Sequence, residues 1–293
     1  MSKPGSAPSL PLVTIVTPSL NQGEFISDAI DSVLTQDYPR VEYRVVDGGS
    51  RDATIDVLRG YGDRIRWTSG PDAGQSAAIH QAFLNASGKY LAWLNADDLY
   101  RPGAISAAVR ELETDPSVGL LYGMAEFIDR DGEVTGPCLQ VEPWSLRRLI
   151  DTLDFVVQPA TFFRRDAYLA VGGLDPALRY CMDYELWIRL GRRYPVRFLT
   201  RPLAQVRVYG ETKTATGGLA RLDEIERMIR RNGGHGLPSD FQREMDLALR
   251  ATLVLAARKG QMAQTARLAV RCAPYAVRAT IRKLRRLYPP GRG

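Results

Sequence analysis

The sequence predicts an α/β fold built on a doubly wound, mostly parallel sheet, with a helical extension towards the C-terminus. Short apolar runs alternate with amphipathic segments of helical length across residues 13–94, and each apolar run ends in a polar or glycine-rich turn. The 293 residues, of which 45% are hydrophobic, suffice for one large domain with an appendage or for two modest domains. Such alternation indicates parallel strands joined by helices that cover both faces of the sheet.

The first 94 residues supply this alternation. Residues 13–18 are typical of a buried strand ending in a proline turn, and Phe25, Ala29 and Val33 then recur at the four-residue spacing of a helix. The expected strands are residues 13–18, 41–46, 64–67 and 91–94. The expected helices are residues 24–36, 52–59 and 75–85.

The pattern changes after Pro102. Residues 118–128 are expected to form a strand, residues 196–208 further strands, and a helix is expected to begin near Asp183 and to continue through Trp187. A short helix is expected over residues 143–149, and the chain beyond residue 217 is expected to be helical. The predicted organisation is a disordered segment over residues 1–11, a main domain over residues 12–216 and a helical, basic region over residues 217–293.

The turns that follow the four strands are unusually polar. They occupy residues 18–19, 47–50, 69–72 and 95–98. In open α/β sheets, ligands bind outside the carboxyl ends of the strands. Four such turns on one edge therefore predict a single pocket there.

Two adjacent carboxylates, Asp97 and Asp98, end the fourth apolar run. Neighbouring acids beside a buried strand are costly unless a positive group lies close by. Carboxylates are ligands for Mg²⁺ or Mn²⁺, and Mg²⁺ usually shares its coordination with a substrate phosphate. A metal site is therefore the favoured interpretation, and the alternative is that one of these acids caps the next helix.

The composition excludes several other classes of protein. His80 and His235 are the only histidines, which excludes a site with several histidine ligands, and the three cysteines lie too far apart for a zinc pattern. The odd number of thiols favours a reducing cytoplasm. Residues 1–11 lack the apolar core of a signal peptide, and no apolar run approaches the roughly 20 residues that span a bilayer.

The net charge of +6 is divided unevenly along the chain. Residues 247–293 contain eleven Arg or Lys and no acid, whereas residues 1–246 contain 28 basic and 33 acidic side chains. Residues 274–288 combine helical apolar spacing with clustered cations, a pattern typical of a helix on an anionic membrane surface. This pattern favours a peripheral position at the inner face of the cell membrane. The alternative is a solvated helix attracted to the acidic body, and nucleic acid is disfavoured because stacking aromatics are lacking.

Five segments of the chain resemble, in order, the motifs of one enzyme family. They are Thr17-Pro18-Ser19-Leu20-Asn21, Val45-Val46-Asp47-Gly48-Gly49-Ser50-Arg51-Asp52, Gly70-Pro71-Asp72-Ala73-Gly74, Leu94-Asn95-Ala96-Asp97-Asp98 and Met182-Asp183-Tyr184-Glu185-Leu186-Trp187. Together they resemble the family 2 glycosyltransferases, which have the GT-A fold, over about residues 12–214. The resemblance implies an inverting transferase that moves a sugar from a nucleotide-diphosphate sugar, expected to be a UDP-sugar, to a hydroxyl of a glycan or lipid-linked acceptor.

The resemblance also implies roles for individual residues. The expected nucleotide-binding residues are Thr17, Pro18, Ser19, Glu24, Asp47, Asp72, Asn95 and Ala96. Six of these residues also have a simpler explanation: turn chemistry accounts for Thr17, Pro18, Ser19, Asp47 and Asp72, and a favourable charge at a helix start accounts for Glu24.

The remaining expected roles concern the metal and the chemistry. Asp97, then Asp98, would hold Mn²⁺ or Mg²⁺, and Asp183 would act as the general base that removes the acceptor proton. The alternative for Asp183 is a helix cap. Gln158 is expected on the acceptor side, and Arg207 and Lys213 are candidate phosphate contacts, with an exposed basic loop as the alternative.

The chain departs from the family pattern in three places. Asn95 replaces the first acid of the Asp-x-Asp motif, Tyr209 stands where related enzymes often have a histidine near the metal, and His80 falls in a segment where many relatives have an Arg-Asn pair. His80 could hydrogen-bond the donor, but a lone helical histidine is more often structural. Asn95 and Tyr209 lend some support to a degraded, non-catalytic binding module docked on a membrane, whereas the retained Asp97, Asp98 and Asp183 oppose it. A nucleotidyltransferase is a further alternative, and the lack of Arg or Lys between Thr17 and Glu24 argues against it.

Overall fold

A computed structural model describes residues 10–152, 154–259, 261–264 and 266–271. The chain divides into two compact units, the first formed by residues 1–146 and 154–212 and the second by residues 147–153 and 213–293.

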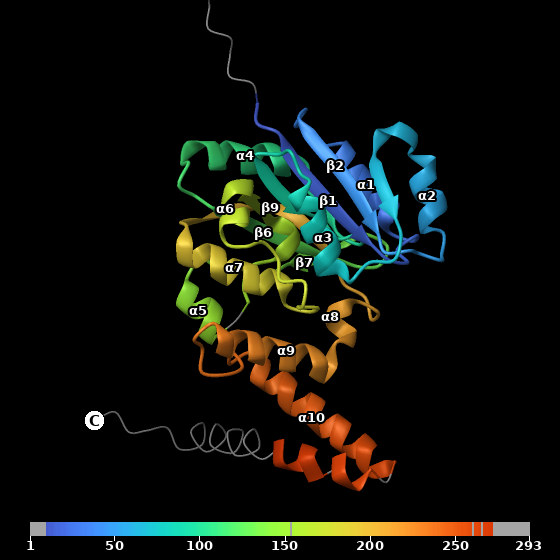
Figure 1. Cartoon of the computed structure of the whole chain (residues 1–293), viewed down its shortest axis with the longest axis vertical. Helices are drawn as coiled ribbons and strands as arrows, with labels where there is room; N and C mark the ends of the chain where they lie inside the picture. The colour runs from blue at the N-terminus through green and yellow to red at the C-terminus, as the bar shows by residue number, and fades with distance from the viewer. Residues whose placement is uncertain (1–9, 153, 260, 265, 272–293) are drawn as a thin grey trace, which may run out of the picture. The chain divides into compact units, whose positions relative to one another are not determined.

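The amino-terminal half of the first unit is a parallel sheet with connecting helices (Figure 1). The strands are β1 (Val13–Ser19), β2 (Val41–Asp47), β3 (Arg66–Ser69) and β4 (Tyr90–Trp93), in the spatial order β3-β2-β1-β4. The helices are α1 (Ile26–Leu34), α2 (Thr54–Gly60) and α3 (Gln75–Leu84). The predicted third strand, residues 64–67, was placed two residues too early, because residues Gly62–Arg64 form a 3₁₀ turn and pairing with β2 starts at Arg66.

The sheet continues beyond β4 with strands of mixed direction. The elements in chain order are β5 (Leu99–Tyr100), α4 (Ala104–Thr114), β6 (Leu120–Ile128), β7 (Val134–Pro137), α5 (Leu146–Asp151), β8 (Thr161–Arg164), α6 (Arg165–Ala170), α7 (Met182–Arg193) and β9 (Val196–Arg207). β8 runs antiparallel to both β4 and β6, and β9 runs parallel to β6. The several strands expected over residues 196–208 are in fact one strand, whose register shifts where Met124 and Ala125 of β6 pair with it.

Alternate residues of β4 separate two cores on opposite faces of the sheet. Tyr90 and Ala92 join a cluster that also contains the buried faces of α1 and α4. Trp93 packs instead against an aromatic cluster from α3, β8, α6 and α7. Helices therefore cover both faces, and the predicted α/β class is confirmed.

The second unit is helical in its described part. It contains α5 except for its first residue, together with α8 (Lys213–Thr216), α9 (Gly218–Arg231) and α10 (Phe241–Arg258). No helix within the described ranges is both long enough and apolar enough to cross a membrane. Residues 1–9 of the predicted disordered segment 1–11, and the predicted membrane-surface segment 274–288, lie outside the described residues. Residues 10 and 11 are held by hydrogen bonds that their carbonyls accept from Arg40 and Tyr38.

Candidate functional site

The carboxyl ends of three parallel strands meet in register. Ser19 of β1 pairs with Asp47 of β2, and Asp47 pairs with Ser69 of β3. This arrangement follows from the parallel topology, in which every strand ends at the same edge. The turns that the sequence marked as polar are therefore neighbours in space.

Asp47 is held by a dense set of hydrogen bonds. Its Oδ2 accepts bonds from Gly49 N (3.0 Å), Ser50 N (2.9 Å) and Ser69 Oγ (2.7 Å), and its Oδ1 accepts one from Ser50 Oγ. Burial acts to raise the pKa of Asp47, but these hydrogen bonds outweigh it and leave the pKa below its ordinary value. Asp47 is therefore an anion whose Oδ1 can accept a further hydrogen bond from a ligand.

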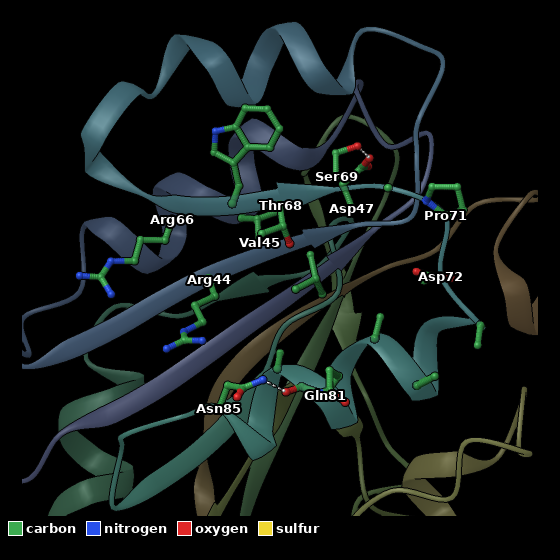
Figure 2. A pocket seen from close by; sticks show the side chains of 17 residues that line it. Arg44, Val45, Asp47, Arg66, Thr68, Ser69, Pro71, Asp72, Gln81 and Asn85 are labelled. Atoms are coloured by element: carbon green, nitrogen blue, oxygen red, sulfur yellow. Dashed lines mark hydrogen bonds between the residues drawn. The ribbon is translucent and has the colours of Figure 1, made fainter.

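A pocket of about 750 Å³ lies beside Asp47, over β2 and β3 and against α3 (Figure 2). Asp47, Ser69 and Asp72 line one part of it, and Arg44 and Arg66 line another. A Cβ on Gly48 would come within 3.0 Å of Asp72 Oδ2. The absence of a side chain at residue 48 thus lets the Asp72 carboxylate lie over the end of β2.

The β1 end of the site contains one unsatisfied polar atom. Among the described residues, no hydrogen-bond partner reaches the buried Ser19 hydroxyl. Buried hydroxyls are normally hydrogen-bonded, so this atom suits a polar ligand. The Thr17 hydroxyl, by contrast, already bonds to Tyr43 Oη at 3.0 Å.

Glu24 forms an ion pair with Arg130. Arg130 Nε and Nη2 each donate to one Glu24 oxygen at 2.7 Å, and the hydrogen bond to Arg130 is the main reason that the pKa of Glu24 is lowered. Arg130 also contacts Glu211 at 3.4 Å. The same guanidinium thus connects three loops.

Asn95 organises the turn that carries the two acids. Its Nδ2 donates to Asp98 Oδ2 (3.1 Å) and to Gln158 Oε1 (3.0 Å), while its Oδ1 accepts from Gln75 Nε2 (3.0 Å). Gln158 in turn donates to the Trp93 carbonyl at 2.8 Å. Both amides are therefore committed to the protein. An aspartate at residue 95 could not donate to Asp98, which gives Asn95 a structural reason to be present.

Asp98 is almost completely buried, whereas Asp97 is half-buried. Burial raises the pKa of both carboxyls, and for Asp98 the neighbouring Asp97 charge raises it further. The alternative that either acid caps the next helix is wrong, because β5 follows the turn and α4 starts only at Ala104.

Arg207 supports this turn from β9. Its backbone N–H donates to Asp98 Oδ1 (3.1 Å) and its Nε to the Asp97 carbonyl (3.1 Å), and the same side chain pairs with Asp28 (3.1 Å). The guanidinium also packs on the Phe25 ring at 4.8 Å. Because the side chain is only 1% exposed, its contacts position the Asp97-Asp98 turn.

Tyr209 completes the surroundings of Asp97. Its hydroxyl donates to Asp97 Oδ2 at 2.8 Å, and its ring lies 5.0 Å from that of Phe25. The tyrosine therefore occupies one carboxylate oxygen of Asp97. The other oxygen accepts no hydrogen bond from another described side chain.

Asp183 lies in the first turn of α7. The opposite end of this helix is followed by Pro195, whose carbonyl accepts a hydrogen bond from Gly119 N beside the start of β6. The start of β6 lies level with that of β4, so the first turn of α7 points towards the carboxyl end of β4. Asp183 also precedes Trp187 by one helical turn, on the same helix face.

Trp187 fixes α7 against β4. Its ring stacks on that of Trp93, with centroids 5.5 Å apart and planes 18° apart. Trp93 is two residues before Asn95, so the stack ties the helix carrying Asp183 to the turn carrying Asp97.

Two other predicted residues have different surroundings. His80 Nδ1 contacts Tyr168 Oη at 2.7 Å, which supports the structural interpretation of this histidine. Lys213 begins α8 of the second unit, and its side chain is exposed.

The model of the family described as "Glycosyl transferase family 2" matches residues 14–169. This match covers more than half of the chain. The chain belongs to glycosyl transferase family 2. The resemblance inferred from the five motif segments is thereby confirmed.

Several family 2 relatives are similar over most of this chain. An uncharacterized glycosyltransferase of Rickettsia typhi is 30% identical over 227 residues, which are 74% of this chain and 70% of the relative. An uncharacterized glycosyltransferase of Rickettsia felis is 32% identical over 69% of this chain, but the chain spans only 35% of that relative's length.

Solved structures with the same fold include two proteins with bound nucleotide sugars. TarS of S. aureus, residues 1–349, in complex with UDP-GlcNAc superposes with a TM-score of 0.62 at 14% identity, covering 81% of this chain and 71% of that one. The mannosyltransferase PcManGT from Pyrobaculum calidifontis, in complex with GDP-Man and Mn²⁺, gives a TM-score of 0.59 at 21% identity and covers 97% and 89% of the two chains. These likenesses confirm the GT-A fold.

The acids of the family motif fit a divalent cation that is shared with a phosphate. Asp97 has one carboxylate oxygen that no other described side chain bonds, whereas both oxygens of Asp98 already accept hydrogen bonds, from Asn95 and from Arg207 N. No cluster of three or more His, Cys, Asp or Glu that could hold a metal occurs among the described residues. Since Mg²⁺ sites commonly use one or two carboxylates plus substrate phosphates, Asp97 suits such a site.

Sequence reasoning missed several residues that shape this family 2 site. Arg130, Phe25 and Gln75 contact Glu24, Arg207 and Asn95 respectively, yet none carries a recognisable motif. Asn21 was quoted without a role: it adopts a left-handed φ of 53°, and its Oδ1 accepts a hydrogen bond from Arg51 N at 2.8 Å. Left-handed backbone is tolerated better by asparagine than by most residues, which was the available signal.

Proposed function

We propose that this protein is an inverting glycosyltransferase that moves a sugar, expected to be a hexose, from a nucleotide-diphosphate sugar to an acceptor hydroxyl. The supporting observation is the meeting, at one sheet edge, of the Asp47 pocket, the unsatisfied Ser19 hydroxyl and the half-buried Asp97. A UDP-sugar donor is proposed because TarS was solved with UDP-GlcNAc, although PcManGT was solved with GDP-Man.

In the proposed donor complex, Asp47 Oδ1 accepts a hydrogen bond from the N–H of a pyrimidine base. Asp72 carries a second carboxylate into the same pocket. Thr17, Pro18 and Ser19 contact the nucleoside, the last through its free hydroxyl, and Glu24 lies next to the nucleoside loop in its pair with Arg130. Asn95 and Ala96 shape the turn between nucleoside and diphosphate, Gln158 is proposed to lie on the acceptor side of that turn, and Lys213 remains a predicted phosphate contact.

Asp97 is the proposed ligand of Mn²⁺ or Mg²⁺, and Asp98 supports it from the buried side. When bound, the cation neutralises charge that develops on the departing diphosphate. Arg207 and Tyr209 position the Asp97 carboxylate, because the first bonds its backbone carbonyl and the second its Oδ2.

Asp183 is the proposed general base. It accepts the proton of the acceptor hydroxyl as that oxygen bonds to the anomeric carbon, and the bond from this carbon to the diphosphate oxygen breaks with its electron pair on the nucleoside diphosphate. Attack from the face opposite the leaving group inverts the anomeric configuration. The acceptor is proposed to be a glycan or a lipid-linked sugar used in building the cell envelope.

A nucleotide-sugar screen tests this proposal. We expect a UDP-sugar with Mn²⁺ to raise the thermal unfolding midpoint, by about 2.7 kcal/mol of stabilisation at a hundred times its dissociation constant. We also expect slow release of UDP. Release of pyrophosphate from a nucleoside triphosphate would instead favour a nucleotidyltransferase, and binding without any UDP release would favour a non-catalytic module.

We further propose that residues 274–288 hold the enzyme at the anionic inner face of the cell membrane. Their clustered cations, with no acid after Asp246, support this placement. Removal of the chain after Ala273 is expected to reduce liposome binding and to leave turnover of soluble substrates intact.

A further inference from the structure

The helix α10 has two apolar faces, and only one of them is buried. Met245, Leu249 and Ala256 form the buried face, where α10 packs against α9. Leu247 and Val254 are 58% and 49% exposed. They are separated by seven residues, so they share one face, and helical geometry places that face opposite the buried one.

Further large apolar side chains are exposed in α10 and in the described residues that follow it. Leu255 is 55% exposed, Met262 77% and Val270 74%. An ordinary solvated helix does not expose several large apolar side chains together, and such patches usually mark a contact surface.

The charges around the outward face of α10 are mainly positive. Arg243, Arg258 and Lys259 are exposed on or next to the helix. Of the three nearby acids, Glu244 pairs with Arg221 at 2.7 Å and Asp246 with Arg250 at 2.9 Å, whereas Asp240, one residue before the helix, is exposed. No acid follows Asp246 in the sequence.

We infer that the outward face of α10, centred on Leu247 and Val254, docks on an anionic lipid bilayer. Apolar side chains flanked by cations are the composition that binds the boundary between head groups and acyl chains. A second copy of this chain fits less well, because two such faces would bring cations against cations. The inference goes beyond the proposed function, because it assigns membrane contact to a described helix in addition to the contact proposed above for residues 274–288.

Vesicle binding by the full-length protein tests this inference without any nucleotide sugar. Co-sedimentation is measured with phosphatidylcholine vesicles that contain or lack phosphatidylglycerol. The wild type is expected to bind mainly the anionic vesicles. The double variant Leu247→Gln/Val254→Gln is expected to bind them about tenfold more weakly, because it removes the apolar side chains that would be buried in the bilayer on binding. Both residues are exposed, so the fold should tolerate the change, which circular dichroism checks.

Two further variants separate the contributions. Arg243→Gln/Arg258→Gln/Lys259→Gln is also expected to bind about tenfold more weakly, with a smaller effect of added salt. Val134→Gln is the matched control, since Val134 is 52% exposed on β7 of the first unit, and it should bind as the wild type does.

Four results would overturn the inference. The first is failure of the wild type to bind anionic vesicles. The second is unchanged binding by the Leu247/Val254 variant, which would leave residues 272–293 as the contact. The third is an equal loss in the Val134 control. The fourth is a dimer in light scattering that the Leu247/Val254 variant abolishes. UDP release from a UDP-sugar is measured separately on the same samples, so failure of the docking surface is distinguishable from failure of the proposed chemistry.

Discussion

The hydroxyl of Tyr209 donates a 2.8 Å hydrogen bond to Oδ2 of Asp97. Tyr209 follows β9 and Asp97 follows β4, so more than a hundred residues separate the two partners in the sequence. The bond restrains the Asp97 carboxylate in a turn that Arg207 and Asn95 already hold from the buried side. Tyr209 thereby fixes one carboxylate oxygen, and no other described side chain donates a hydrogen bond to the second.

Tyr209→Phe is expected to weaken Mn²⁺ binding by about 10-fold or more, because partners that orient a metal ligand typically contribute 10- to 100-fold to metal affinity. The measurement is a Mn²⁺ titration followed by electron paramagnetic resonance in the presence of UDP. Tyr61→Phe is the matched control, because the Tyr61 hydroxyl bonds the Ser27 carbonyl at 3.1 Å and not Asp97. Equal Mn²⁺ affinity in all three proteins would show that Tyr209 does not orient Asp97.

Asp183→Asn is expected to reduce sugar transfer by roughly 10²- to 10⁴-fold, the usual contribution of a general base. Nucleotide affinity, measured by isothermal titration calorimetry with UDP, should stay unchanged. Glu185→Gln provides a comparison in the same helical turn, because Glu185 pairs with Arg189 and is expected to affect turnover far less. Loss of UDP binding in Asp183→Asn would remove Asp183 from the catalytic role.

Trp187→Ala is expected to lower the free energy of unfolding by about 3–5 kcal/mol, the usual effect of removing a large buried aromatic side chain. Trp187 is fully buried and stacks on Trp93, so nearby side chains cannot easily fill the space. Urea denaturation measures the loss. Trp67→Ala, at a partly exposed tryptophan of β3, should cost clearly less, and an equal loss would contradict the packing argument.

The stability of the fold is expected to depend on pH through His80. Burial, and then the charge of Arg189, lower the pKa of His80, so the folded protein holds a neutral imidazole where the unfolded chain is already protonated. The free energy of unfolding should therefore fall as the pH decreases below about 6.5, the ordinary histidine pKa, and this contribution should be constant above it. Denaturation between pH 7 and 5 should show a smaller fall for His80→Gln. His235→Gln, at an exposed histidine, should retain the wild-type slope.

Much of the fold followed from local patterns in the chain. Alternating strand and helix periodicity predicted β1, β2, β4 and the helices between them. Each of these segments buries side chains in a core, so the spacing of its own apolar residues reveals its type. β5, β7, α4 and α6 were not predicted. Three of these are short, and β5 and β7 exist only because β9 and β6 lie beside them.

The candidate site shows the same division. Asp47, Asp72, Asp97 and Asp183 were identified from sequence, because motif segments and the ends of apolar runs are local features. The contacts of Arg130 and Tyr209 were not predictable, since each depends on loops that the fold brings together from distant parts of the chain.

The sequence by itself determined the α/β class and the family, because both depend on motifs and periodicities within short segments. It also determined the edge of the sheet where the polar turns gather, because the carboxyl ends of parallel strands all lie at one edge. Only the tertiary structure decided what each polar side chain is free to do. Asn95, Gln158, Arg207 and Asp98 are committed to one another or to backbone, whereas the Ser19 hydroxyl has no partner among the described residues and Asp97 bonds one described side chain, Tyr209. The physical reason is that a hydrogen-bonding group has a limited number of partners, and those partners come from strands and loops far apart in the chain.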